Sequence, residues 1–240
     1  MAESTPSPLG GSPAVASGGA LTVDVGRLMS ERLGLSQSDL ITRPTGRAVR
    51  EAIEACTADA SGGSVALVEL SGVRVMDFSC ADEVVARLLL RGQDSSRSAM
   101  RYFIFRGREH LHGHAVAEVL SRRGLAAACA FGGRPFHPVG EVSDGQRAVW
   151  HALEERRSIA LGDATTLLGP GGRARLVRIC EMRLAHLGSG GQVTALSRVG
   201  RGGGDGAVRS PSSPDADSAS RSRASRESLD LGRSPRRGAS

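Results

Sequence analysis

The sequence of 240 residues contains no lysine, so all 31 of its basic residues are arginines. Aromatic residues make up only 3% of the chain, so a core must depend on Val, Leu, Ile and Ala. No apolar run approaches the roughly 18 residues of a membrane-spanning helix. The N-terminus also lacks the basic-then-apolar pattern of a secretory signal. These absences predict a cytoplasmic protein.

The basic residues are unevenly distributed. Residues 1–145 carry 15 arginines against 16 acids, residues 146–200 carry 8 against 4, and residues 201–240 carry 8 against 5. Abundant Ala, Gly and Arg without Lys is typical of GC-rich coding bias, which weakens a high pI as evidence for nucleic-acid binding. The location of the excess, in the last 95 residues, is more informative.

Signals for metal, disulfide or catalytic chemistry are poor. The four cysteines are far apart, which favours reduced, buried thiols. His110, His112 and His114 alternate, but they straddle an expected loop-to-helix junction where the outer side chains diverge. The chain has no Gly-x-x-x-x-Gly-Lys, His-Glu-x-x-His or Gly-x-Ser-x-Gly motif. We therefore expect no metal, no cofactor and no enzymatic activity.

Residues 20–132 alternate between strand and helix patterns. Strands are expected at residues 21–25, 65–70, 101–106 and 125–131. Helices are expected at residues 45–57, capped by Thr45, and at 111–123, ending at Gly124. Between them, Ser79 followed by Asp82 resembles a capping box and predicts a helix start, with Val84, Val85, Leu88 and Leu89 facing inward. The pattern predicts a four-stranded α/β layer domain.

The remaining segments differ in composition. Residues 1–19 and the Arg/Ser/Gly-rich residues 200–240 have few large apolar groups and are expected to be disordered. Residues 133–142 are rich in Gly and Pro and are interpreted as a linker. In residues 143–199, Ser143 and Gln146 predict a capping box and a helix to residue 157, followed by helices at 163–168 and 173–187 and a strand at 192–196. That order is expected of a winged helix-turn-helix.

The α/β part resembles a STAS domain, the fold of bacterial anti-sigma factor antagonists and of sulfate-transporter tails. The motifs that carry the resemblance are Ser79-Cys-Ala-Asp-Glu83 and Arg43-Pro-Thr-Gly-Arg47, which look most like the STAS-like group of unassigned function. The resemblance covers roughly residues 20–132. It implies a module that binds a regulatory protein.

In anti-sigma antagonists the corresponding turn commonly reads Asp-Ser-Ser-Gly, and a partner kinase phosphorylates the first serine. Here Phe78 occupies that position, and Ser79 is the only hydroxyl left in the turn. Ser79 is therefore a phosphorylation site or a structural N-cap, and Asp77 either positions this serine or is a solvated turn carboxylate. The expected partner-binding or switch residues are Asp77, Phe78, Ser79, Asp82 and Glu83.

Residues 143–199 resemble small winged helix-turn-helix regulators, on the helix order and on Met182-Arg-Leu-Ala-His-Leu187 before the wing. At 100° per residue, Arg175 and Arg178 lie opposite the apolar side of the third helix, and Arg173 lies at its boundary. Arg183 lies within the apolar stripe. The expected DNA contacts are Arg173, Arg175 and Arg178, with Arg198 on the wing; the alternative is a solvated face.

Together these patterns predict a non-enzymatic bacterial regulator, with a STAS-like interaction module joined to a DNA-binding winged helix. The alternative is an anti-sigma-antagonist-type partner-switching protein that does not bind DNA. The expected partners are a kinase-like or anti-sigma-like protein and DNA, and no membrane partner is expected.

Overall fold

The computed structural model describes residues 21–36, 38–58, 64–94 and 102–199 of the chain. Both segments that were expected to be disordered, 1–19 and 200–240, lie outside the described residues. The described part is a mixed α/β structure, as the alternating sequence pattern predicts. No helix among the described residues is long and apolar enough to cross a membrane.

The main sheet has five strands in the order β1-β3-β5-β6-β7. The first four are parallel and β7 is antiparallel to β6, with Ala127 opposite Val139. The fifth strand corrects the expectation of four strands, because β7 comes from residues interpreted as a linker. Pro138 lies within β7, which is tolerated because β7 is an edge strand. The strands are β1 (Leu21–Asp24), β3 (Val65–Glu69), β5 (Tyr102–Gly107), β6 (Ala126–Phe131) and β7 (His137–Gly140).

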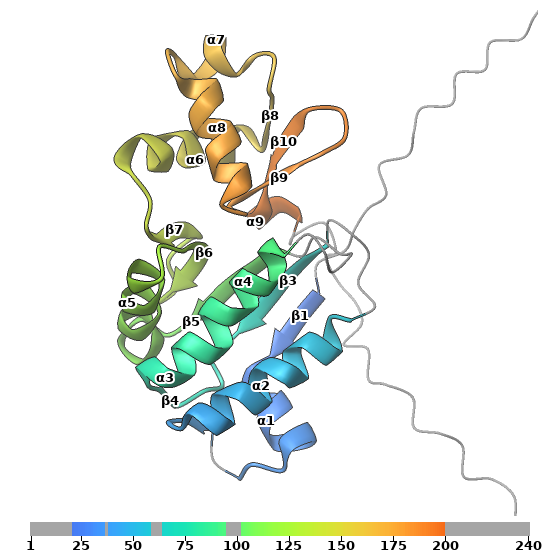
Figure 1. Ribbon diagram of the computed structural model, residues 1–240, viewed down its shortest axis with the longest axis vertical. Coiled ribbons are helices and arrows are strands. Elements are labelled where there is room, and N and C mark those ends of the chain that lie inside the picture. Colours follow the sequence, from blue (N-terminus) through green and yellow to red (C-terminus); the bar gives the residue numbers. More distant parts are fainter. Residues whose placement is uncertain (1–20, 37, 59–63, 95–101, 200–240) are drawn as a thin grey trace, which may run out of the picture. The chain divides into compact units, whose positions relative to one another are not determined.

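Helices cover one face of this sheet (Figure 1). They are α1 (Val25–Leu33), α2 (Arg43–Cys56), α3 (Phe78–Ala81), α4 (Arg87–Gln93) and α5 (His114–Arg122), with π-helical turns η1 (Asp82–Ala86) and η2 (Glu109–Gly113). The inward stripe expected at Val84, Val85, Leu88 and Leu89 is confirmed, since all four side chains are buried. A two-stranded parallel pair, β2 (Asp39–Leu40) and β4 (Val75–Met76), lies apart from the main sheet.

Alternation along the central strands sends side chains into two cores. In β5, Phe103 and Phe105 join the core under the helices, whereas Tyr102 and Ile104 join a second core. The second core is completed by residues after 143, including Trp150, Leu153 and Leu176. Full burial of each large apolar side chain contributes about 1.5–3 kcal/mol, so both faces of the central strands stabilise the fold.

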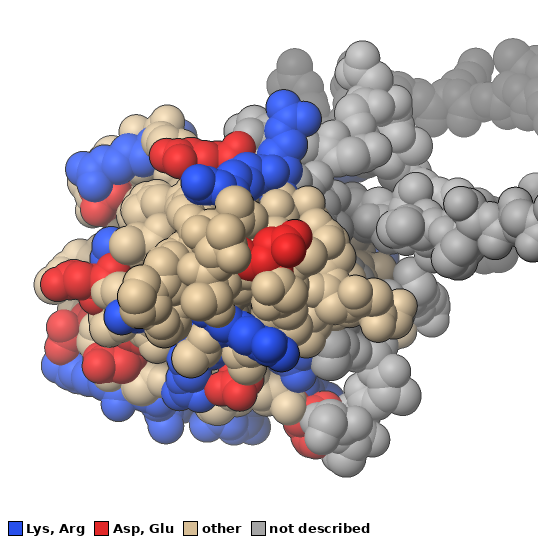
Figure 2. Space-filling model, turned by 90° about the horizontal axis from the view of Figure 1, so that it is seen from above, with Lys and Arg blue, Asp and Glu red and all other residues tan. Residues whose placement is uncertain are grey.

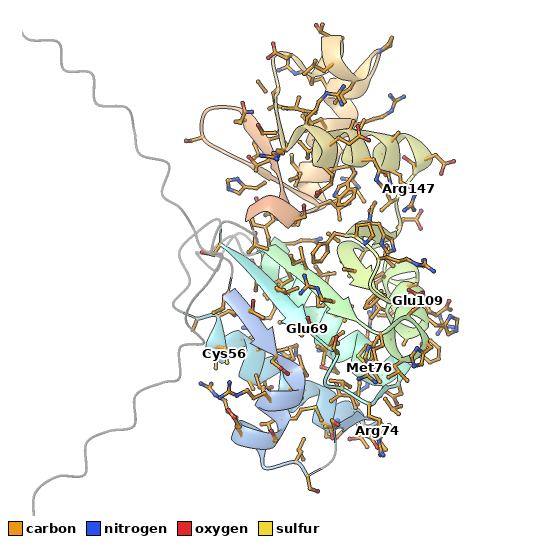
Figure 3. All side chains as sticks on the ribbon, turned by 180° about the vertical axis from the view of Figure 1, so that it is seen from behind. Cys56, Glu69, Arg74, Met76, Glu109 and Arg147 are labelled. Atoms are coloured by element: carbon orange, nitrogen blue, oxygen red, sulfur yellow. The ribbon has the colours of Figure 1, made fainter. Side chains whose placement is uncertain are left out.

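Residues 143–199 form their own three-stranded antiparallel sheet, β8-β10-β9, with four helices. In chain order the elements are α6 (Asp144–Arg156), β8 (Ser158–Ala160), α7 (Ala164–Leu168), α8 (Gly172–Glu181), β9 (Ala185–Leu187), β10 (Gln192–Ala195) and α9 (Leu196–Val199). The Ser143 and Gln146 capping box is confirmed by reciprocal hydrogen bonds of 2.8 and 3.3 Å. Arg147, labelled in Figure 3, donates to the carbonyl of Pro138 at 2.7 Å, linking α6 to β7.

The third helix is shorter than the sequence pattern predicts. It ends at Glu181 instead of continuing to residue 187, because Arg183 has a φ of 60° and the chain turns into β9. The apolar side that contains Leu176 and Cys180 is buried as expected, but Leu184 reaches the core from the turn. The carbonyl of Leu184 accepts a hydrogen bond from Trp150 Nε1 at 3.2 Å, which fixes this turn against α6.

Candidate functional site

The corner where β4 leads into α3, residues 77–79, is held by the Asp77 side chain. Asp77 is the N-cap of α3, and its carboxylate accepts the backbone N–H of Cys80 at 2.7 Å. The Ser79 hydroxyl donates to the same carboxylate at 3.0 Å. The expectation that Ser79 caps this helix was therefore wrong: Asp77 satisfies one of the free N–H groups of the first turn, that of Cys80, and the serine lies inside this turn.

The same correction applies to the start of α2. Thr42, not Thr45, is the N-cap, and its hydroxyl accepts the Thr45 backbone N–H at 3.3 Å. In both places two cap-forming residues lie within three positions of each other. Their order along the helix depends on backbone angles that composition does not determine.

The corner is open to solvent. Phe78 is 45% exposed, with its ring edge-on to His114 at a centroid distance of 5.7 Å. Ile41 and Val75, from the chain around the β2 and β4 pair, are also exposed. The Asp77 backbone N–H donates to Leu40 O at 2.8 Å, which joins the corner to that pair. Arg74 and Met76, labelled in Figure 3, mark the same region. Aromatic and aliphatic groups around a polar centre are suited to protein contact.

Asp82 and Glu83 lie in a different environment from the corner. Both are buried in the π-helical turn η1 that follows α3 without a break, and Glu83 has no exposed surface. Such turns are rare in proteins, and those that occur are often found at functional sites. The structure therefore separates the five expected site residues into an open corner and a buried acidic pair.

Four arginines surround this acidic pair. Asp82 accepts two hydrogen bonds from Arg123, both of 2.8 Å. Glu83 accepts one from Arg43 at 3.0 Å and lies 3.3 Å from Arg87 Nε and 3.7 Å from Arg50 Nε. Buried carboxylates require such partners, because an unpaired buried charge is strongly destabilising. We refer to Arg43, Arg50, Arg87, Arg91 and Arg123 as the arginine cluster.

Arg91 joins the cluster through Glu54, which also accepts from Arg50 at 2.6 Å. This cluster was not predicted from the sequence. Its members come from α2, α4 and the end of α5, and several partners are about 40 positions apart. The detectable signal was local: Glu83 and Arg87, and Arg50 and Glu54, have the i,i+4 spacing of helical ion pairs.

Helix α2 packs closely against α3 and η1 beside the acidic pair. Gly46 of α2 meets the first turn of α3, where an added Cβ would lie 3.0 Å from Cys80 Cα and 3.2 Å from Glu83 Cβ. The Cys80 thiol donates to Thr42 O at 3.1 Å. Burial, aided by the nearby Asp77, raises the pKa of this thiol to about 12. The thiol therefore stays protonated and does not act as a nucleophile at neutral pH.

Of the three alternating histidines, His112 is held inside the fold. His112 is buried: its Nδ1 accepts the Arg108 N–H, and its Nε2 lies 3.0 Å from Val73 O. Burial lowers the pKa of His112, so the neutral ring that joins these two groups is favoured. Among the described residues, no cluster of three or more His, Cys, Asp or Glu side chains has metal-binding geometry. All four cysteines are unpaired thiols, three of them buried, as expected.

The expected DNA-contact residues lie on α8. Arg173, Arg175 and Arg178 are exposed, as the helix phase predicts, while Leu176 on the other side is buried. Arg175 donates to Pro170 O at 3.1 Å and Arg178 pairs with Glu181 at 3.0 Å. The side chain of Arg198 lies outside the described part of the chain.

Arg183, which follows α8, is placed differently from the exposed arginines of that helix. The Arg183 guanidinium lies 5.8 Å from the centre of the Tyr102 ring, so it covers an aromatic face instead of joining the exposed arginines. Figure 2, viewed from the α7 end of Figure 1, shows basic and acidic side chains interspersed on a largely uncharged surface.

No family model, no curated protein and no solved structure matches this chain.

Proposed function

We propose that this chain is a non-enzymatic regulatory protein that binds a protein partner at the corner formed by residues 77–79. The observation that carries the proposal is the exposed Phe78 side chain next to a serine whose hydroxyl donates to Asp77. The corner follows a short strand and opens a helix, which is the arrangement that the STAS-like resemblance assigns to partner binding.

The corner also has the chemistry of a charge-sensitive switch. The Ser79 hydroxyl lies 3.0 and 3.1 Å from the two carboxylate oxygens of Asp77. A phosphate or carboxylate at position 79 would set a second negative charge against this group. Repulsion at that distance would displace Asp77 from the Cys80 N–H and change the start of the helix.

The test is a quantitative pull-down from lysate of the native host, using the full chain. Phe78→Ala should abolish capture of a specific partner, and Ser79→Asp should weaken it strongly. Leu167→Ala is the matched control, because Leu167 is 45% exposed and lies on α7, outside the corner. Equal capture by the wild type and by all three variants would refute the proposal.

For the part after residue 143, we infer a winged-helix module that contacts DNA through α8. Helix, strand, two helices and a hairpin follow one another in the order of that module, and the edge-to-edge strand order is β8-β10-β9. The exposed arginines of α8 are available for phosphate contacts.

An electrophoretic mobility-shift assay at several salt concentrations tests this second element. Removing two phosphate contacts with Arg175→Ala and Arg178→Ala should reduce the slope of log K against log salt by about 2. Arg122→Ala is the control, since Arg122 is exposed and ion-paired on another helix. Absence of binding at low salt, or an unchanged slope, would favour the alternative of a partner-switching protein that does not bind DNA.

A further inference from the structure

A surface cavity of about 460 Å³ lies beside the buried acidic pair. Its lining includes four members of the arginine cluster, together with one apolar and one acidic side chain: Arg50, Arg87, Arg91, Arg123, Leu90 and Asp94. This volume is within the range of small-molecule sites, about 300–1,000 Å³. The partner corner and the exposed arginines of α8 contribute no residue to it.

Buried carboxylates hold the arginines of this cavity in place. Arg87 meets Glu83 through Nε, Arg123 meets Asp82, and Arg91 meets Glu54. These three carboxylates are largely buried, whereas the side chains of Arg87, Arg91 and Arg123 are 44–47% exposed. Negative charge is thus placed inside and guanidinium groups face the cavity.

The exposed guanidinium groups of the cavity keep N–H donors for a ligand. A guanidinium has five N–H donors, and the atom pair that joins Arg87 to Glu83 is its Nε and the carboxylate, 3.3 Å apart. Its two terminal nitrogens are then available to an incoming acceptor. Arg50 forms the floor: its side chain is 9% exposed, and its Nε has no hydrogen-bond partner among the described residues. Guanidinium groups fixed by carboxylates are suited to bind phosphate oxygens without a large loss of side-chain entropy.

We propose that this cavity binds a phosphorylated small molecule, whose phosphate meets Arg87, Arg91 and Arg123. The half-exposed Leu90 side chain and the arginine stems provide an apolar surface for the organic part. A longer polyanion is less suited to the site, because the basic lining is one patch that includes Asp94 and has the exposed Glu51 close to Arg50.

Isothermal titration of the full chain at low ionic strength tests the proposal with three probes: pyrophosphate, adenosine 5′-monophosphate and adenosine. The two phosphates should bind with a Kd at or below about 1 mM, and adenosine should not bind. Arg87→Gln and Arg91→Gln should each weaken the phosphates by about tenfold. Arg122→Gln should leave binding unchanged, because Arg122 is paired with Glu118 on the outer side of α5.

Thermal denaturation of each variant separates lost binding from lost folding. If Arg87→Gln lowers stability, Arg91→Gln decides, because Arg91 is half-exposed and its one ion pair with a described residue is with Glu54. Failure of both phosphates to bind, equal binding of adenosine, or unchanged affinity in Arg91→Gln would overturn the proposal. Binding of an oligonucleotide but not of the mononucleotide would overturn it as well. Because no corner residue is altered, these results are independent of the partner-binding test.

Discussion

Replacing Glu83 by Gln should destabilise the protein by about 2 kcal/mol. The substitution removes the charge from a side chain with no exposed surface that accepts a hydrogen bond of 3.0 Å from Arg43. A hydrogen bond to a charged group contributes about 1.5–3 kcal/mol. The longer approaches of Arg87 and Arg50 add less.

Two effects limit the loss. Arg43 and Arg87 are nearly half exposed and regain water when the carboxylate is removed. Arg50 is buried but retains Glu54 at 2.6 Å, so it does not become an unpaired buried charge. The net value therefore lies in the lower half of the range for a charged hydrogen bond.

Urea denaturation followed by circular dichroism measures this difference. For a protein of this size, about 2 kcal/mol corresponds to a fall in Tm of roughly 4–8 °C. Glu51→Gln is the control, because Glu51 is 59% exposed and approaches Arg50 only to 3.4 Å; its effect should stay within about 0.5 kcal/mol. Equal losses in the two variants would refute the account of η1 as an ion-paired turn.

Three other outcomes are expected. Burial lowers the pKa of His112 below its ordinary value, so as the pH falls the imidazole is protonated in the unfolded chain before it is protonated in the folded protein. The free energy of unfolding should therefore fall as the pH drops below about 6.5. In a series of denaturation experiments at different pH values, His112→Gln should remove this part of the pH dependence. Gly46→Ala places a methyl group 3.0 Å from Cys80 Cα and should cost about 1–2 kcal/mol after the gain in helix propensity, whereas Gly162→Ala, with nothing within 4 Å, should change the Tm little. Since the pKa of Cys80 is about 12, its alkylation at pH 8 should be much slower than that of the partly exposed Cys56, and urea should abolish the difference.

Periodicity and capping gave much of the fold correctly. The buried stripe at Val84, Val85, Leu88 and Leu89 followed from helical spacing, and the α6 start followed from Ser143 and Gln146. These signals depend on residues within one or two turns of each other, so a single sequence contains them in full.

Features that depend on distant residues were missed. The arginine cluster requires α2, α4 and α5 to converge, and no local spacing encodes that approach. The three-residue strands β8 and β9 carry too few positions for a period, and Pro138 concealed the edge strand β7. At the corner, the sequence predicted a helix start but misassigned its cap, which is Asp77 and not Ser79. The division into separate STAS-like and winged-helix domains stays a prediction.

The two-sided burial of the central strands has a consequence for dissecting this protein. A fragment ending after β7 would leave Tyr102, Ile104 and Ala128 without the side chains of Trp150 and Leu176 that cover them. Such a fragment would expose these apolar side chains to water and should aggregate. Both halves should then melt in a single cooperative transition, so a perturbation in one half changes the stability of the other.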